Sequence, residues 1–152
     1  MSIFNGIENA EIFERGKYLA GGFHGVVECQ RTLTKETIKS GIGFIVEFKI
    51  VESNMPDVHP VGSRATWFQK MSDKTVAFPA IKAWASAMAG YQPHQKQEIE
   101  NEVAPHLSDT LAHATENETD NVFTGVAVTV STETVITRNG REFTRHQWAP
   151  LS

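Results

Sequence analysis

The sequence contains few of the features that mark secreted, membrane-spanning or disulfide-stabilised proteins. Its 152 residues include one cysteine, Cys29, so no internal disulfide framework is available. No apolar run reaches the ~18–20 residues that cross a bilayer, and the N-terminus has no basic start followed by an apolar stretch. We therefore expect a cytoplasmic protein without membrane contacts, in which Cys29 is a small strand residue.

Signatures of catalysis and of metal binding are also missing. The six histidines match no zinc spacing. The glycine-rich stretches GGFHG and SGIGF lack the lysine and Ser/Thr that complete a phosphate-binding loop, and no Ser/His/Asp set has a local signature. We expect no enzyme activity, no metal and no cofactor.

The charge of the chain is unevenly distributed. The net charge is −4, but residues 92–121 hold seven acidic residues and one basic residue, a local charge of −6. The remaining 13 basic and 11 acidic residues give +2. A negatively charged partner is therefore compatible with the rest of the chain, for which the length predicts one domain, 1–152.

Three strands are predicted in the first half. Residues 17–30 form a strand interrupted by glycines, which favour bends or bulges. A polar turn follows at 31–41, and 43–53 alternates apolar and polar residues with the period of two that a strand requires. After a loop at 54–62, the segment 63–71 is the third strand.

The second half begins with helical segments and ends in a hairpin. Pro79 and Gly90 suit the ends of a helix over 77–90. The acidic insertion 92–121, interrupted by Pro105, is predicted to form one or two short helices or a long ordered excursion. Two strands, 123–137 and 142–150, flank an Asn-Gly turn. The expected fold is mainly β (α+β): a five-stranded OB-type barrel with a helix between strands three and four and a helical acidic insertion.

Several stretches together resemble the OB-fold single-stranded DNA-binding proteins of bacteriophages. The resemblance covers about residues 16–150 and is carried by SGIGFIVEFKIVES, VGSRATWF, IKAWASAMAG, TGVAVTV and REFTRHQWAP. It implies sequence-independent binding of single-stranded DNA in phage DNA replication or recombination, in the host cell cytoplasm, with phage replication or recombination proteins as further partners. Many such proteins end in an acidic tail, whereas this chain ends in WAPLS, which puts recruitment through a tail in doubt.

Binding a single strand requires cations for the phosphates and aromatic faces for the bases. On the third strand, Arg64, Phe68 and Lys70 share one face, and Lys49 should neighbour them on the outward face of the second strand. Either Phe68 or Trp67 faces inward, and we expect Trp67 to do so. Phe68 would otherwise be a second-layer core residue, and the cations solvated surface.

Further candidates come from the first strand and the final hairpin. The first strand offers Lys17, Tyr18 and, where it ends, Arg31; the hairpin offers Arg138, Arg141, Phe143 and Arg145. In an OB barrel the loop between strands four and five lies beside the binding groove, so an arginine-tipped hairpin could clamp a nucleic-acid backbone. Arginines also flank turns for solubility, and Tyr18 could instead close the barrel bottom.

A second function class remains open. The chain could be a phage structural or assembly protein that uses a small β-barrel as an interaction module, with the acidic segment as its contact surface. The N-terminal arm, 1–15, is apolar enough to pack on its own barrel or on a neighbouring copy, so a homo-oligomer is also open.

Overall fold

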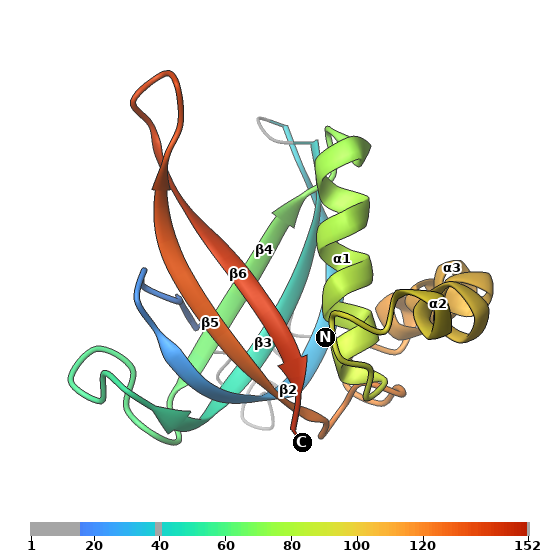
Figure 1. Cartoon of the computed structure of the whole chain (residues 1–152), viewed down its shortest axis with the longest axis horizontal. Helices are drawn as coiled ribbons and strands as arrows, with labels where there is room; N and C mark the ends of the chain where they lie inside the picture. The colour runs from blue at the N-terminus through green and yellow to red at the C-terminus, as the bar shows by residue number, and fades with distance from the viewer. Residues whose placement is uncertain (1–15, 39–40, 152) are drawn as a thin grey trace, which may run out of the picture.

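A curled sheet of six strands forms most of the structure, a computed structural model that describes residues 16–38 and 41–151 (Figure 1). The strands are β1 (Lys17–Tyr18), β2 (His24–Thr37), β3 (Gly41–Ser53), β4 (Arg64–Lys70), β5 (Ala127–Ile136) and β6 (Glu142–Pro150). Their order in the sheet is β1-β4-β3-β2-β5-β6. All neighbours are antiparallel except β1 and β4. The predicted mainly β fold is confirmed at this level.

The strand connections follow a Greek-key path. Strands β2, β3 and β4 pair in succession, and β5 returns after the helices to lie beside β2. Strands β4 and β6 are not hydrogen-bonded neighbours, so the sheet remains a half-barrel. The rings of Trp67 on β4 and Trp148 on β6 bridge this opening, with centroids 5.0 Å apart.

Alternation along β3 and β4 directs large side chains into the core. Phe44, Val46, Phe48 and Ile50 of β3 belong to one buried cluster, as does Trp67 of β4. The predicted inward face of β3 and the inward position of Trp67 are therefore confirmed, although Ile45 and Glu47 on the opposite face of β3 are buried as well. Burial of such side chains is the main favourable contribution to folding.

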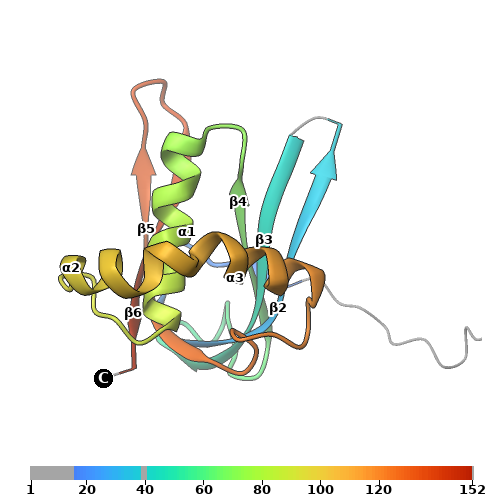
Figure 2. The same cartoon turned by 90° about the vertical axis from the view of Figure 1, so that its right-hand side faces the viewer.

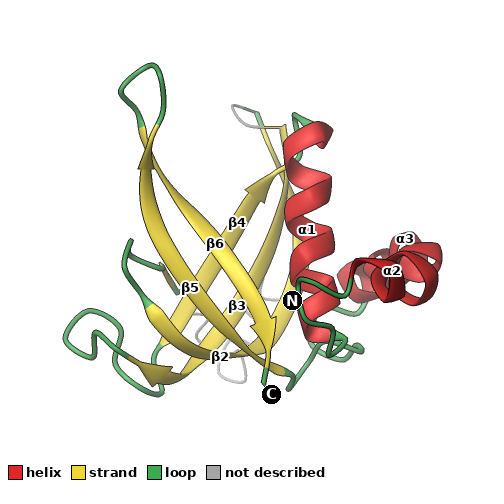
Figure 3. Ribbon diagram, in the orientation of Figure 1, coloured by secondary structure: helices red, strands yellow, loops and turns green. Residues whose placement is uncertain are grey.

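Helix α1 (Lys74–Met88) packs against β4 and β6 at the open side of the half-barrel (Figure 3). Its buried stripe contains Ile81, Trp84 and Met88, as the sequence predicts. The helix begins before the predicted residue 77, because the Asp73 carboxylate caps it by accepting a hydrogen bond from the Thr75 N–H at 3.0 Å. Pro79 consequently lies inside the helix, not in its first turn.

The acidic segment is helical, as predicted, and runs through α2 (Lys96–Glu98), the π-helical stretch η2 (Ile99–Val103) and α3 (Ala104–Glu116). Pro105 does not interrupt it, since proline is tolerated in the first turn of α3. Figure 2 shows this segment lying across α1 and the β2–β3 side of the sheet, where Leu107 and Leu111 pack against the core.

Two predictions for the first half are wrong. Most of the predicted polar turn at 31–41 is strand, because β2 continues through Thr37 and pairs with β3 from Gly25 to Thr37. The predicted strand 17–30 is divided into β1 and β2 by a turn containing Gly22, whose φ is +87°. The sheet therefore has six strands instead of five. Lys17–Tyr18 pairs with β4 because Gly16 has no Cβ, which would lie 2.7 Å from the Ala65 backbone.

Candidate nucleic-acid interface

The outward face of β4 is only partly open to solvent. Arg64 and Lys70 are exposed at its two ends, and Phe68 is half-buried over Gly43, where an added Cβ would lie 2.1 Å from the phenyl ring. Thr66 is 1% exposed, and its hydroxyl donates to the Gly16 carbonyl at 3.0 Å. Glu47, which neighbours Thr66 on β3, is 3% exposed. The exposed cations therefore lie at the two ends of this face, about 20 Å apart at ~3.3 Å per residue.

One group of candidate residues gathers where β1 meets β4, and we call it the β1–β4 cluster: Lys17, Tyr18, Lys49 and Arg64. Lys17 pairs in register with Ala65, beside Arg64, and Lys49 lies directly across from Arg64 on β3. Tyr18 is 61% exposed, so it does not close the barrel bottom. Three cations and one accessible ring are brought together here.

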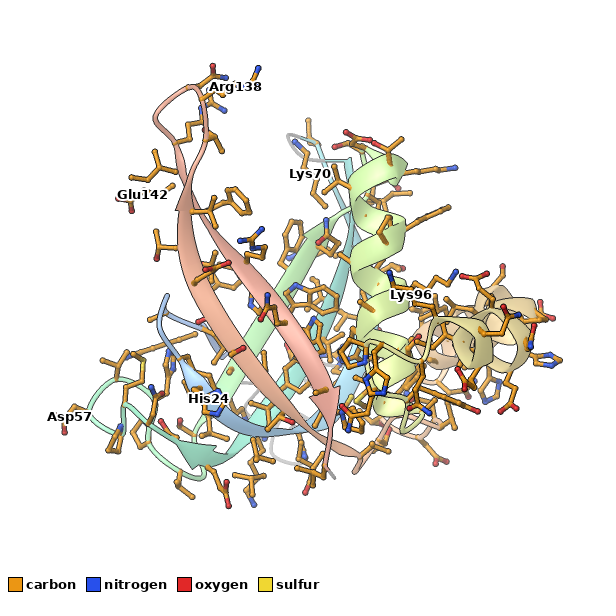
Figure 4. The ribbon with its side chains drawn as sticks, in the orientation of Figure 1. His24, Asp57, Lys70, Lys96, Arg138 and Glu142 are labelled. Carbon is orange, nitrogen blue, oxygen red and sulfur yellow. The ribbon has the colours of Figure 1, made fainter. Side chains whose placement is uncertain are left out.

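A second group lies at the other end of the half-barrel, and we call it the hairpin cluster: Arg138, Arg141 and Phe143. The hairpin tip is a three-residue loop in which the Thr137 N–H donates to the Arg141 carbonyl at 2.8 Å and Gly140 has a φ of +76°. Phe143 is 47% exposed. Figure 4 shows Arg138 and Lys70 at this same end of the molecule, on opposite arms of the opening.

Two candidate arginines are held in ion pairs. The guanidinium of Arg31 donates to Glu118 from Nε at 2.9 Å, so this residue ties β2 to the end of the acidic segment. It also lies within β2, not at the end of a strand as predicted. Arg145 on β6 pairs with Glu133 on β5, its cross-strand neighbour. Neither belongs to the two clusters above.

The acidic residues of the helical segment contact neighbouring groups on the same side of the molecule. Glu100 accepts from Lys82 of α1, and Glu102 accepts from the hydroxyl of Tyr91, whose pKa this hydrogen bond raises. In Figure 1 the segment lies on the side of α1 that is away from the β5–β6 hairpin. It therefore does not cover the hairpin cluster.

A cavity of about 790 Å³ lies between α1, β6 and the segment that leads into α2. Tyr91, Lys96, His146 and Trp148 are among its lining residues. Burial lowers the pKa of His146 to about 4, against a smaller effect of its hydrogen bond with the Thr144 backbone. The imidazole is therefore neutral near pH 7 and contributes no cation to this cavity.

Two further buried groups have shifted pKa values. Burial raises the pKa of the Cys29 thiol to about 12, so the thiolate is not available for chemistry at neutral pH. Burial, helped by the charge of Lys17, lowers the pKa of His59. His59 lies in the β3–β4 loop and is 2% exposed. No sequence pattern marks His59 as a candidate, because it is a lone histidine in a loop that contains Pro56 and Pro60.

In residues 16–38 and 41–151, no three side chains of His, Cys, Asp or Glu are grouped so that they could hold a metal ion. No helix in that part of the chain is long and apolar enough to cross a membrane.

No model of a known protein family matches the chain, and no curated protein matches it.

Proposed function

We propose that the protein binds single-stranded DNA without sequence preference, through an OB-type barrel formed by β2–β6, in phage DNA replication or recombination. The strand path supports this proposal. Three strands, a helix and two further strands are joined as a partly open Greek key, which is the architecture of the OB fold.

The distribution of unpaired cations carries the proposal. OB folds bind oligonucleotides on the face of their second and third strands and at the loop between the fourth and fifth. In this chain those regions are the β3–β4 face, with Lys49, Arg64 and Lys70, and the hairpin tip, with Arg138 and Arg141. None of the five forms an ion pair with another described residue.

Each group of cations also has an exposed ring nearby, Tyr18 at one end and Phe143 at the other. Because the centre of the β3–β4 face is buried, a bound strand would contact the two ends and bridge the distance between them. Aromatic stacking and backbone charge together suffice for binding that does not read sequence.

A direct test is titration of the protein with a fluorescent oligo-dT of a few tens of nucleotides, at low and moderate salt, beside a duplex of the same length. We expect tight binding of the single strand that weakens steeply with salt, because each neutralised phosphate releases counterions. Duplex binding should be much weaker. Equal affinity for both would indicate charge attraction alone, and binding of neither would favour the assembly role.

A further inference from the structure

A cavity of about 390 Å³ lies between β1 and the loop that joins β3 to β4. Lys17 and Arg64 line it, and His59 and Ser63 contribute to its wall. No acidic residue of 16–38 or 41–151 is among its lining residues. Asp57 belongs to the same loop, but Figure 4 shows it at the outer tip, pointing away from the sheet. Among the residues that the structure describes, the cavity therefore presents two cations and no carboxylate to a ligand.

The wall of the cavity is held in place by the fold. The Ala20 N–H donates to Nε2 of the buried His59 at 3.0 Å, which ties the loop to the segment that follows β1. The Gly62 N–H donates to the Ile50 carbonyl at 2.8 Å, and the Ile50 N–H donates to the Ser63 carbonyl at the same distance. A ligand would meet a preformed site and would lose little free energy in ordering it.

Few opposite charges neutralise the cations around this cavity within the described part of the chain. Lys49 lies directly opposite Arg64, and like charges at such positions destabilise a sheet. Lys17, Lys49 and Arg64 form no ion pair with any residue of 16–38 or 41–151. The nearest acid in register is Glu28, which is the other cross-strand neighbour of Lys49. Positive charge concentrated at a concave, preformed site is suited to an anion.

We propose that this cavity is a subsite for one phosphate group of the bound nucleic acid. Lys17 and Arg64 contact the phosphate oxygens, Lys49 adds attraction at longer range, and the exposed ring of Tyr18 stacks on the adjoining base. The assignment deepens the proposed DNA binding and rests on it. It makes the β1–β4 cluster the fixed anchor point, with the hairpin tip as the second contact.

The first test compares Lys17→Ala and Arg64→Ala with Lys96→Ala, a control cation that Figure 4 places on the acidic helical segment. Oligo-dT affinity is measured from low to moderate salt for each. Loss of one phosphate contact should reduce the slope of log K against log salt by ~0.7, which corresponds to about fivefold weaker binding at 0.1 M salt. The control should behave as the wild type, and thermal melting should confirm that every variant is folded.

In the second test, the protein is titrated with inorganic phosphate and, separately, with thymidine monophosphate. Binding is measured from the NMR shifts of the backbone amides in 58–64 and from the pKa of His59. We expect saturable shifts that Arg64→Ala removes, and a raised pKa of His59, because a bound anion favours the imidazolium.

The two tests separate the subsite from the general function. If oligo-dT binds but Lys17→Ala and Arg64→Ala match Lys96→Ala, the subsite is refuted while DNA binding stands. If oligo-dT does not bind, the proposed DNA binding is refuted, and the phosphate titration then tests only whether the cavity binds an anion. Saturable shifts that depend on Arg64 would keep an anion site, and their absence would refute it.

Discussion

Protonation of His146 should weaken the seam between β4 and β6. The imidazole stacks on Trp148 with centroids 5.5 Å apart and planes 11° apart, and it lies 6.1 Å from the ring of Trp67. Its Nε2 is buried and, within the part of the chain that the structure describes, has no hydrogen-bond partner. A proton added at Nε2 would therefore place an unpaired charge in the aromatic packing that closes the half-barrel.

The direction and size of the effect follow from the pKa. Burial lowers the pKa of His146 from 6.5 to about 4, so the folded state favours the neutral ring. The stabilisation is fully present above pH 6.5 and is lost as the pH falls toward 4. Between pH 7.5 and pH 5, the difference in proton binding by the folded and unfolded chains amounts to about 2 kcal/mol of unfolding free energy.

Urea denaturation at pH 7.5 and pH 5 measures this quantity when the wild type is compared with His146→Phe. Phenylalanine keeps an aromatic ring beside Trp148 but cannot titrate. His59, whose lowered pKa acts in the same direction, is present in both proteins, so its contribution cancels. The wild type should lose about 2 kcal/mol more than the variant on acidification. Equal losses would refute the burial of a neutral His146 at this seam.

Two stability predictions concern the contacts that hold the half-barrel and the acidic segment together. Trp148→Ala should lower the free energy of unfolding by about 3–5 kcal/mol, because it leaves a cavity beside Trp67 and Phe48. Trp148→Phe should cost less, because it keeps an aromatic ring there. A loss below about 1 kcal/mol for Trp148→Ala in urea denaturation would contradict the bridging role. Asn121→Ala should cost about 2 kcal/mol, because the Asn121 amide donates to the Thr32 hydroxyl at 3.0 Å and its carbonyl accepts from the Phe123 N–H at 2.9 Å. In Asn121→Ala, native-state hydrogen exchange should accelerate over the wild type more in α3 than in β3. An equal acceleration in both elements would contradict a local anchor.

Much of the fold was predictable because its signals are local. The alternation in β3 and β4, the buried stripe of α1 and the final hairpin depend on side chains within a few positions of one another, and the structure confirms each. The segment 31–37 was mistaken for a turn because its Thr and Lys residues look like a polar loop. It is a strand because β3 offers hydrogen-bond partners through Thr37.

The candidate site was predictable only as a set of residue types. Arg31 and Arg145 are candidates on the same grounds as Arg64 and Arg138, because all four are cations on predicted strands or turns. Which of them are neutralised depends on pairing across the chain, such as that of Arg31 with Glu118, 87 positions away. Periodicity contains no information about such a partner.

The sequence alone determined which side chains of β3 and β4 point into the core of the half-barrel, because the period of two is a property of the backbone of a strand. It also determined that the acidic charge is local, since that charge lies in one continuous segment. Tertiary structure alone decided that Lys17 and Arg64 line one cavity, with Lys49 directly across from Arg64, and that the acidic segment lies on the other side from the hairpin. The physical reason is that electrostatic attraction and repulsion depend on distance in space, which strand pairing sets between residues far apart in the chain.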